Sequence, residues 1–233
     1  MASTGAFTGD EHFFRKMALF LTVVTIAGFG YNIGAGKVSL SGLPGVVFVH
    51  AAIFMAWIVL LIVQPTLIGR NNLLLHRRLG WAGIVLSVLI VWLGWEVTID
   101  LMLRQPESRN GVVLAIQMLP IVCFAILVFF GIILRKRSDW HRRLMLCATI
   151  TLTAPAWARL LPGWLFGPFF LYAISGVLIL TMLAGVVHDR RRHRAFHPAY
   201  WFAIALLVVG TGLLIPVGLS EPLTNYAKGL EAG

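Results

Sequence analysis

Two histidines in a repeated motif are the residues best suited to cofactor chemistry. Arg70 and His76 recur as Arg135 and His141, and each pair stands in the pattern Arg, five residues, then His-Arg-Arg-Leu. Imidazole nitrogens bind metal ions, and two histidines on neighbouring helices can ligate a haem iron from both faces. The motif therefore predicts one b-type haem held between His76 and His141.

The residues around these histidines suit the same cofactor. Arg77 and Arg142 directly follow the two histidines, and guanidinium groups bind carboxylates such as haem propionates with two parallel hydrogen bonds. Asp139 and Asp189 could orient an imidazole, as the hydrogen-bond partners of metal-bound histidines do. The alternative is that His-Arg-Arg anchors the chain to lipid headgroups, and the sequence leaves that choice open.

Four other polar residues interrupt apolar segments, namely His50, Glu96, Gln117 and Arg159. Ionisable side chains in such segments are costly unless they face the protein interior and pair with one another. We expect an ion pair between Glu96 and Arg159, with His50 and Gln117 completing a polar pocket for a small molecule or a proton. The alternative is a clamp that fixes the helices relative to one another.

The composition shows what kind of element positions these residues. Apolar residues make up 59% of the 233 residues, charged residues 12%, and the mean hydropathy is +0.87. A soluble domain of this size cannot hide so much apolar surface, so part of the solvent is lipid. A soluble enzyme, a disordered chain, a secreted disulfide scaffold and a nucleic-acid binder are excluded.

Apolar runs of about 20 residues are long enough to cross a bilayer as helices. The sequence has such runs at about 17–36, 44–68, 79–102, 111–134, 142–161, 164–187 and 199–218. We therefore expect an all-α bundle of seven transmembrane helices that forms a single domain over 1–233, with a short polar tail at 219–233.

The distribution of basic residues predicts the orientation. Fourteen of the nineteen Lys and Arg residues fall on one side of the expected spans, which places the N-terminus in the cytoplasm and the C-terminus outside. Anionic lipids are the first expected partner. Arg15 and Lys16 before an apolar run also resemble a signal peptide, whereas the spacing of Gly30 and Gly34 favours a helix that packs closely on a neighbour.

The repeated motif also suggests an internal duplication. Its matched positions are 65 residues apart, and each copy opens a span. Spans 2–3 and 4–5 are therefore candidate copies of one hairpin, related by an axis along the membrane normal.

The stretch from His50 to Arg159 carries a family resemblance. Its motifs are QPTLI (64–68), LHRRLGW (75–81), HRRLM (141–145) and APAWAR (154–159). It resembles a widespread group of uncharacterised bacterial inner-membrane proteins, which is distantly similar to transmembrane b-type cytochromes and ferric-reductase-like proteins. Those proteins carry haem on histidine pairs. The outer half offers His50 alone, so the resemblance implies one haem, near the cytoplasmic side.

Three functions fit these observations. The chain is a redox protein of the inner membrane with one haem, or an accessory or structural subunit that binds a membrane-protein partner or a second copy, or a haem-free binding or transport protein that uses the outer pocket. The sequence assigns no catalytic residue. His188, His193 and His197 form a further group, which is interpreted as a solvated basic turn.

Overall fold

The computed structural model describes residues 10–230, and every regular element within them is helical, which confirms the all-α prediction. The longer helices are α1 (Asp10–Gly34), α2 (Gly45–Gly69), α3 (Leu73–Arg104), α4 (Gly111–Ile133), α5 (Ser138–Leu152), α6 (Ala154–Leu160), α8 (Phe170–His193) and α9 (Pro198–Gly218). The shorter elements are α7 (Gly163–Phe166), α10 (Glu221–Gly229) and 3₁₀ turns at Leu40–Gly42, Pro106–Ser108, Leu134–Lys136 and Gly167–Phe169.

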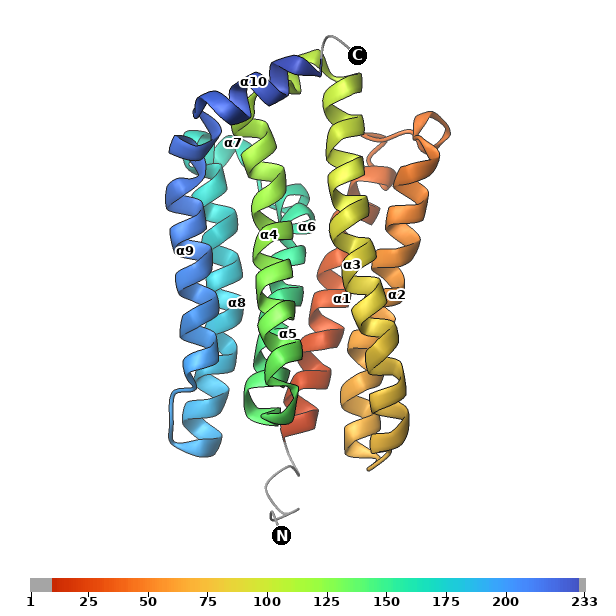
Figure 1. Ribbon diagram of the computed structural model, residues 1–233, viewed down its shortest axis with the longest axis vertical. Helices are drawn as coiled ribbons and strands as arrows, with labels where there is room; N and C mark the ends of the chain where they lie inside the picture. The colour runs from red at the N-terminus through yellow and green to blue at the C-terminus, as the bar shows by residue number, and fades with distance from the viewer. Residues whose placement is uncertain (1–9, 231–233) are drawn as a thin grey trace.

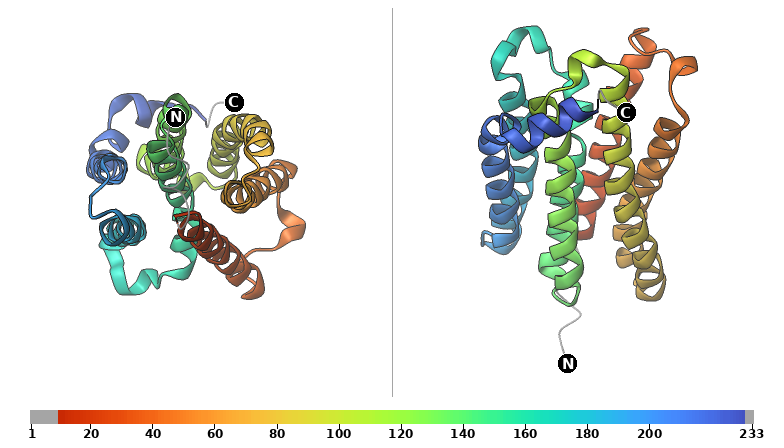
Figure 2. Two further views of the ribbon diagram at one scale, coloured as in Figure 1. Left: turned by 90° about the horizontal axis from the view of Figure 1, so that it is seen from below. Right: turned by 45° about the horizontal axis from the view of Figure 1, so that its top comes forward.

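The long helices run roughly parallel to one axis (Figure 1). Seen along that axis, α4 and α5 lie between the α2–α3 pair and the α8–α9 pair, and α1 packs beside α2 and α6 (Figure 2). The connections α2–α3, α4–α5 and α8–α9 lie at one end, which we call the basic end because most arginines are there. The start of α1 is at the basic end and α10 is at the opposite end (Figure 1).

Six helical segments in the described residues are long and apolar enough to cross a membrane, so this is a membrane-embedded helical protein. Large apolar side chains cover their outer faces. Leu180 on α8, for example, is 66% exposed, and Trp81 on α3 is 69% exposed. Such surfaces are suited to lipid rather than water.

The span expected at 142–161 differs from the others because it is divided into α5 and α6, and neither reaches the length of a spanning helix. Pro155 causes the division, since it has no N–H to donate to the carbonyl of Thr151. The segment is also central: α5 has buried residues at every position from Leu146 to Thr151. A helix surrounded by protein does not need an apolar surface, so this region contains more polar side chains.

The expected hairpins, α2–α3 and α4–α5, both pack as antiparallel pairs. His76 is the fourth residue of α3 and His141 the fourth residue of α5, so the repeated motif opens both helices at the same position. The second helices of the two hairpins differ in length, since α3 has 32 residues and α5 has 15. The duplication stays a prediction.

The expected polar tail at 219–233 contains a helix over its described part. α10 lies across the end opposite the basic end, over α4 and towards α3 (Figure 1). Ala227 is fully buried there against Met102 and Leu114, and the ring of Tyr226 lies 5.8 Å from that of Trp95. α10 therefore connects the ends of α9, α4 and α3.

The glycine that permits close packing of α1 is Gly28, and the expectation for Gly30 and Gly34 was wrong. A Cβ atom at Gly28 would lie 2.5 Å from the carbonyl oxygen of Ala156 on α6, whereas one at Gly30 or Gly34 would meet nothing within 4 Å. The backbones of α1 and α6 therefore approach each other closely at Gly28, which a larger residue would prevent.

We expect Gly28→Ala to destabilise the protein by about 1–3 kcal/mol, the usual cost of forcing extra atoms into a packed site. Gly30→Ala is the matched control and should have no destabilising effect, because its Cβ enters open space. Unfolding of both variants in detergent measures the difference. Equal stability of the two variants would contradict the close contact.

Candidate functional site

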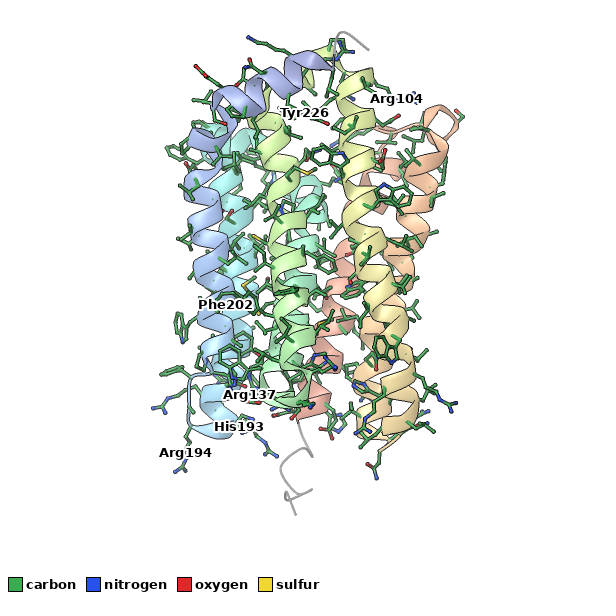
Figure 3. The ribbon with its side chains drawn as sticks, viewed as in Figure 1. Arg104, Arg137, His193, Arg194, Phe202 and Tyr226 are labelled. Carbon is green, nitrogen blue, oxygen red and sulfur yellow. The ribbon has the colours of Figure 1, made fainter. Side chains whose placement is uncertain are left out.

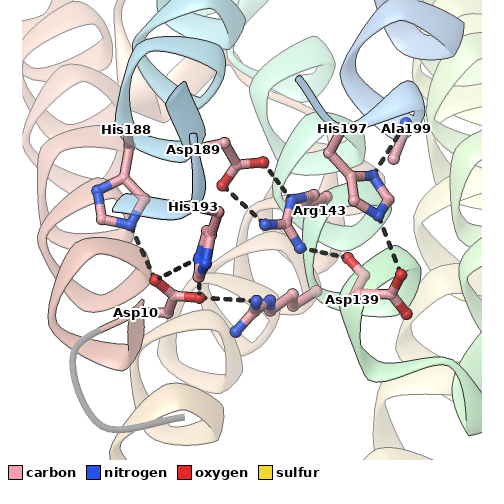
Figure 4. Close-up of polar contacts among 9 residues, drawn as sticks. Asp10, Asp139, Arg143, His188, Asp189, His193, His197 and Ala199 are labelled. Carbon is pink, nitrogen blue, oxygen red and sulfur yellow. Dashed lines mark hydrogen bonds and ion pairs between the residues drawn. The ribbon is translucent and has the colours of Figure 1, made fainter. Parts of the chain in front are cut away.

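Charged and polar side chains gather at the basic end of the bundle. Arg137, His193 and Arg194 lie there, while Arg104 lies at the opposite end (Figure 3). Several of the groups at the basic end are buried and bind one another across α1, α5, α8 and α9 (Figure 4). These buried contacts differ from the solvated basic turn expected for His188, His193 and His197.

Asp10 is the centre of the first set of contacts, and it is only 2% exposed. Its carboxylate binds Nη2 of Arg142 at 2.7 Å, Nε2 of His188 at 3.1 Å and Nε2 of His193 at 2.9 Å. The imidazole of His188 also stacks on Phe13 with ring centroids 4.0 Å apart. A single carboxylate at the start of α1 therefore joins this helix to α5 and α8.

Arg143 and Asp189 form a buried ion pair between α5 and α8. Nε of Arg143 donates to Oδ2 of Asp189 at 2.6 Å and Nη2 donates to Oδ1 at 2.7 Å, and the two side chains are 3% and 2% exposed. Nη1 donates to the backbone carbonyl of Asp139 at 2.8 Å. Each nitrogen of the guanidinium group thus has an acceptor, as a buried charge requires.

His197 is held in one tautomer at the start of α9. Its Nδ1 accepts the backbone N–H of Ala199 at 3.2 Å, so Nε2 carries the hydrogen that it donates to Oδ2 of Asp139 at 3.1 Å. Burial lowers the pKa of His197, and Asp139 offsets this only in part. Burial alone would raise the pKa of Asp139, but the hydrogen bond from His197, the backbone N–H groups at the start of α5 and the nearby imidazole together outweigh it and leave the pKa below its usual value. Neutral His197 and ionised Asp139 are therefore the stable forms.

We expect the stability of the protein to fall when the pH is lowered from about 7.5 to about 5.5. The unfolded chain binds a proton at His197 near the ordinary pKa of 6.5, before the folded chain does, because protonation breaks the bond to Ala199. Melting temperature as a function of pH measures this. His197→Asn keeps a cap for α9 without titrating, so its pH dependence should be weaker. If the melting temperature of His197→Asn fell with pH as steeply as that of the unchanged protein, His197 would not be the group responsible.

The two predicted haem ligands differ in their surroundings. Nδ1 of His141 bonds the backbone carbonyl of Gly131 on α4 at 2.8 Å. Nδ1 of His76 is buried without a partner, and the backbone carbonyl of His76 accepts from Gln64 at 3.3 Å. The two imidazoles are close enough to interact electrostatically. Nε2 of each ring makes no hydrogen bond among the residues described, so both are available to a ligand.

The two arginines expected to bind haem propionates have different positions. Arg77 is exposed on α3 beside His76. Arg142 binds Asp10 instead, and its guanidinium group also lies over the ring of Phe14 at 5.4 Å. Asp139 and Asp189 were expected to orient an imidazole, which Asp139 does for His197. Asp189 binds Arg143 instead.

The predicted ion pair between Glu96 and Arg159 is wrong. Glu96 accepts a hydrogen bond from Nε1 of Trp92 at 3.1 Å on α3. Arg159 on α6 donates to the carbonyl of Pro155 at 2.7 Å and lies over the ring of Phe29 at 4.3 Å. Each of the two side chains therefore finds its hydrogen-bond partner within its own helix.

The other two residues of the expected outer pocket have different surroundings. Nδ1 of His50 is buried without a partner, and Gln117 lines a small cavity formed by α4, α5, α6, α8 and α9. No hydrogen bond or ion pair in the described part of the chain joins any two of His50, Glu96, Gln117 and Arg159. The pocket stays a prediction without support from the contacts of these four side chains.

Sequence reasoning missed Asp10 and the role of the nearby histidines. One signal was present: Asp10 and Asp189 are two of only nine acidic residues in a chain of net charge +10. Acidic residues at the ends of apolar segments in such a basic chain are the natural partners of its arginines. The contacts across four helices required the tertiary structure.

No family model, curated protein or solved structure matches the chain. The resemblance to haem-binding membrane proteins therefore stays a prediction.

Proposed function

We propose that the chain is a redox-active protein of the bacterial inner membrane that holds one b-type haem between His76 and His141. The six spanning segments support the membrane part of this proposal. The basic end would face the cytoplasm, because basic residues are retained there during insertion. Its exposed arginines would bind anionic lipids. α5 and α6 together would make the seventh crossing, which puts the C-terminus outside.

The contact that carries the haem proposal is the hydrogen bond from Nδ1 of His141 to the carbonyl of Gly131. Metal-bound histidines commonly donate their second N–H to a backbone carbonyl, which fixes the tautomer and leaves Nε2 for the metal. His76 would supply the second ligand. Its Nδ1 is buried without a hydrogen-bond partner, so this nitrogen, rather than Nε2, would be the one that binds the iron.

The two arginines expected to bind haem propionates fit the haem proposal in part. Arg77, which is exposed beside His76, would bind a propionate, whereas Arg142 binds Asp10 and is no longer assigned that role. A bound haem would supply reversible one-electron transfer. The protein's part would be to supply the two imidazoles, fix the tautomer of His141 and exclude water with the surrounding helices.

An absorption spectrum of the purified protein, oxidised and then reduced with dithionite, tests the proposal. We expect a Soret band that shifts on reduction together with sharp α and β bands, as low-spin bis-histidine haem gives. His76→Ala and His141→Ala should each abolish these bands, whereas His50→Ala should keep them. A colourless protein after expression with ample haem would overturn the proposal, and so would a spectrum that survives both changes.

A further inference from the structure

A cavity of about 320 Å³ lies at the basic end, between the start of α5, the end of α8 and the segment that leads into α9. The polar and charged residues of its lining include Ser138, Asp139, Arg142, Arg143, Asp189 and His197. Arg143 and Asp189 bond each other there, and His197 bonds Asp139 (Figure 4). Ser138 and Ala195 line the cavity and are exposed, so it reaches the surface. Its volume is within the range of small-molecule sites.

The two carboxylates of the lining are already bound by the protein. Asp189 accepts two hydrogen bonds from Arg143, whose positive charge balances its own. Asp139 accepts a hydrogen bond from His197, and it lies in the first turn of α5, where the partial positive charge of the helix N-terminus stabilises it. Neither carboxylate is therefore an unpaired charge that requires a bound cation.

The other charges around the cavity are positive. Arg142 belongs to the lining, whereas its partner Asp10 on α1 does not. α9 also begins at the cavity, with His197 as its N-cap, and a helix N-terminus has a partial positive charge. The sequence places fourteen Lys and Arg residues at this end, against four acidic residues, namely Asp10, Glu11, Asp139 and Asp189. Such an excess of positive charge concentrates anions in a cavity.

We infer that this cavity binds the phosphate group of a phosphate ester. Phosphate oxygens accept hydrogen bonds, and guanidinium groups and helix N-termini are groups that commonly bind them. The exposed hydroxyl group of Ser138 is a further donor in the lining. Two sources supply this chemistry, namely a free ester such as glycerol 3-phosphate and a lipid headgroup such as that of phosphatidylglycerol. A metal cation is disfavoured, because two arginines line the cavity.

This inference does not depend on the haem, and the test uses the full chain in dodecyl maltoside, a detergent without phosphate. Ser138→Asp adds a negative charge to the lining at the first residue of α5, where an acidic residue favours the helix. Asn71→Asp is the matched control. Asn71 is exposed in the α2–α3 connection at the same end and does not line the cavity, and aspartate tolerates its left-handed backbone. Melting temperatures show whether both variants fold.

The first arm measures the binding of radiolabelled glycerol 3-phosphate, and the second measures retained phosphatidylglycerol by native mass spectrometry. We expect Ser138→Asp to weaken binding about tenfold, because it places a like charge beside the phosphate, whereas Asn71→Asp should weaken it less than about twofold. Ala195→Trp fills the cavity without changing the charge, so it should also weaken binding, and it replaces Ser138→Asp if that variant does not fold. A loss on Ser138→Asp in the first arm alone identifies a free ester, and one in the second arm alone identifies a lipid headgroup.

Three results would overturn the inference. Absence of binding in both arms would show that the cavity is not a phosphate site. Equal losses for Ser138→Asp and Asn71→Asp would show that the probes respond to the general charge of the basic end rather than to the cavity. Displacement of the labelled ester by glycerol as effectively as by unlabelled glycerol 3-phosphate would show that the phosphate is not the group recognised.

Discussion

Asp189→Ala is expected to lower the free energy of unfolding by about 3–5 kcal/mol, the cost of removing one partner from a buried ion pair. The change leaves the guanidinium group of Arg143, which is 3% exposed, without the carboxylate that accepts two of its hydrogen bonds. The charge cannot be relieved by deprotonation, since arginine stays protonated at any pH that the protein tolerates. Titration with a denaturing detergent measures the loss.

The exposed pair of α3 is the matched control for this change. Nε of Arg104 binds Asp100 at 2.9 Å, but the side chains are 55% and 26% exposed. Asp100→Ala should therefore cost less than about 1 kcal/mol. Replacing Arg143 and Asp189 together by Met and Leu should recover most of the loss, because no charge then stays buried. A similar loss for Asp100→Ala and Asp189→Ala would show that burial is not the cause.

The sequence predicted the helices well where lipid contact selects the residues. The apolar runs at 44–68, 111–134 and 199–218 agree closely with α2, α4 and α9, since a helix with lipid on its outer face must be apolar along its whole length. The apolar run at 142–161 predicted the observed helices less well. Its helix is enclosed by protein, and Pro155 divides it.

The candidate sites were predicted less well, because the sequence gives the depth of a residue but not its neighbours. Glu96 and Arg159 were paired on depth alone, yet each bonds within its own helix. Asp10 was missed for the same reason. Its partners lie between 132 and 183 residues away along the chain, a relation that no local pattern records.

Asp10→Ala is expected to lower the free energy of unfolding by about 2–3 kcal/mol, which is less than the full cost of breaking a buried pair. Asp10 is 2% exposed, but its partners Arg142, His188 and His193 are 22%, 21% and 35% exposed, so water can replace part of what they lose. The change should also free the start of α1. Hydrogen exchange at its first turns should rise, while exchange in α9 should not.

Asp10→Asn separates the two contributions of the carboxylate. The amide keeps one oxygen that accepts a hydrogen bond from a histidine, but it loses the attraction to Arg142, so its stability should lie between that of Asp10→Ala and the unchanged protein. If Asp10→Ala retained full stability and left exchange at α1 unchanged, the carboxylate would not hold this helix. If Asp10→Asn were as stable as the unchanged protein, hydrogen bonding alone would account for the contact. An intermediate stability of Asp10→Asn would show that hydrogen bonding and charge attraction both contribute. This is the result expected for a carboxylate whose partners lie on two neighbouring helices.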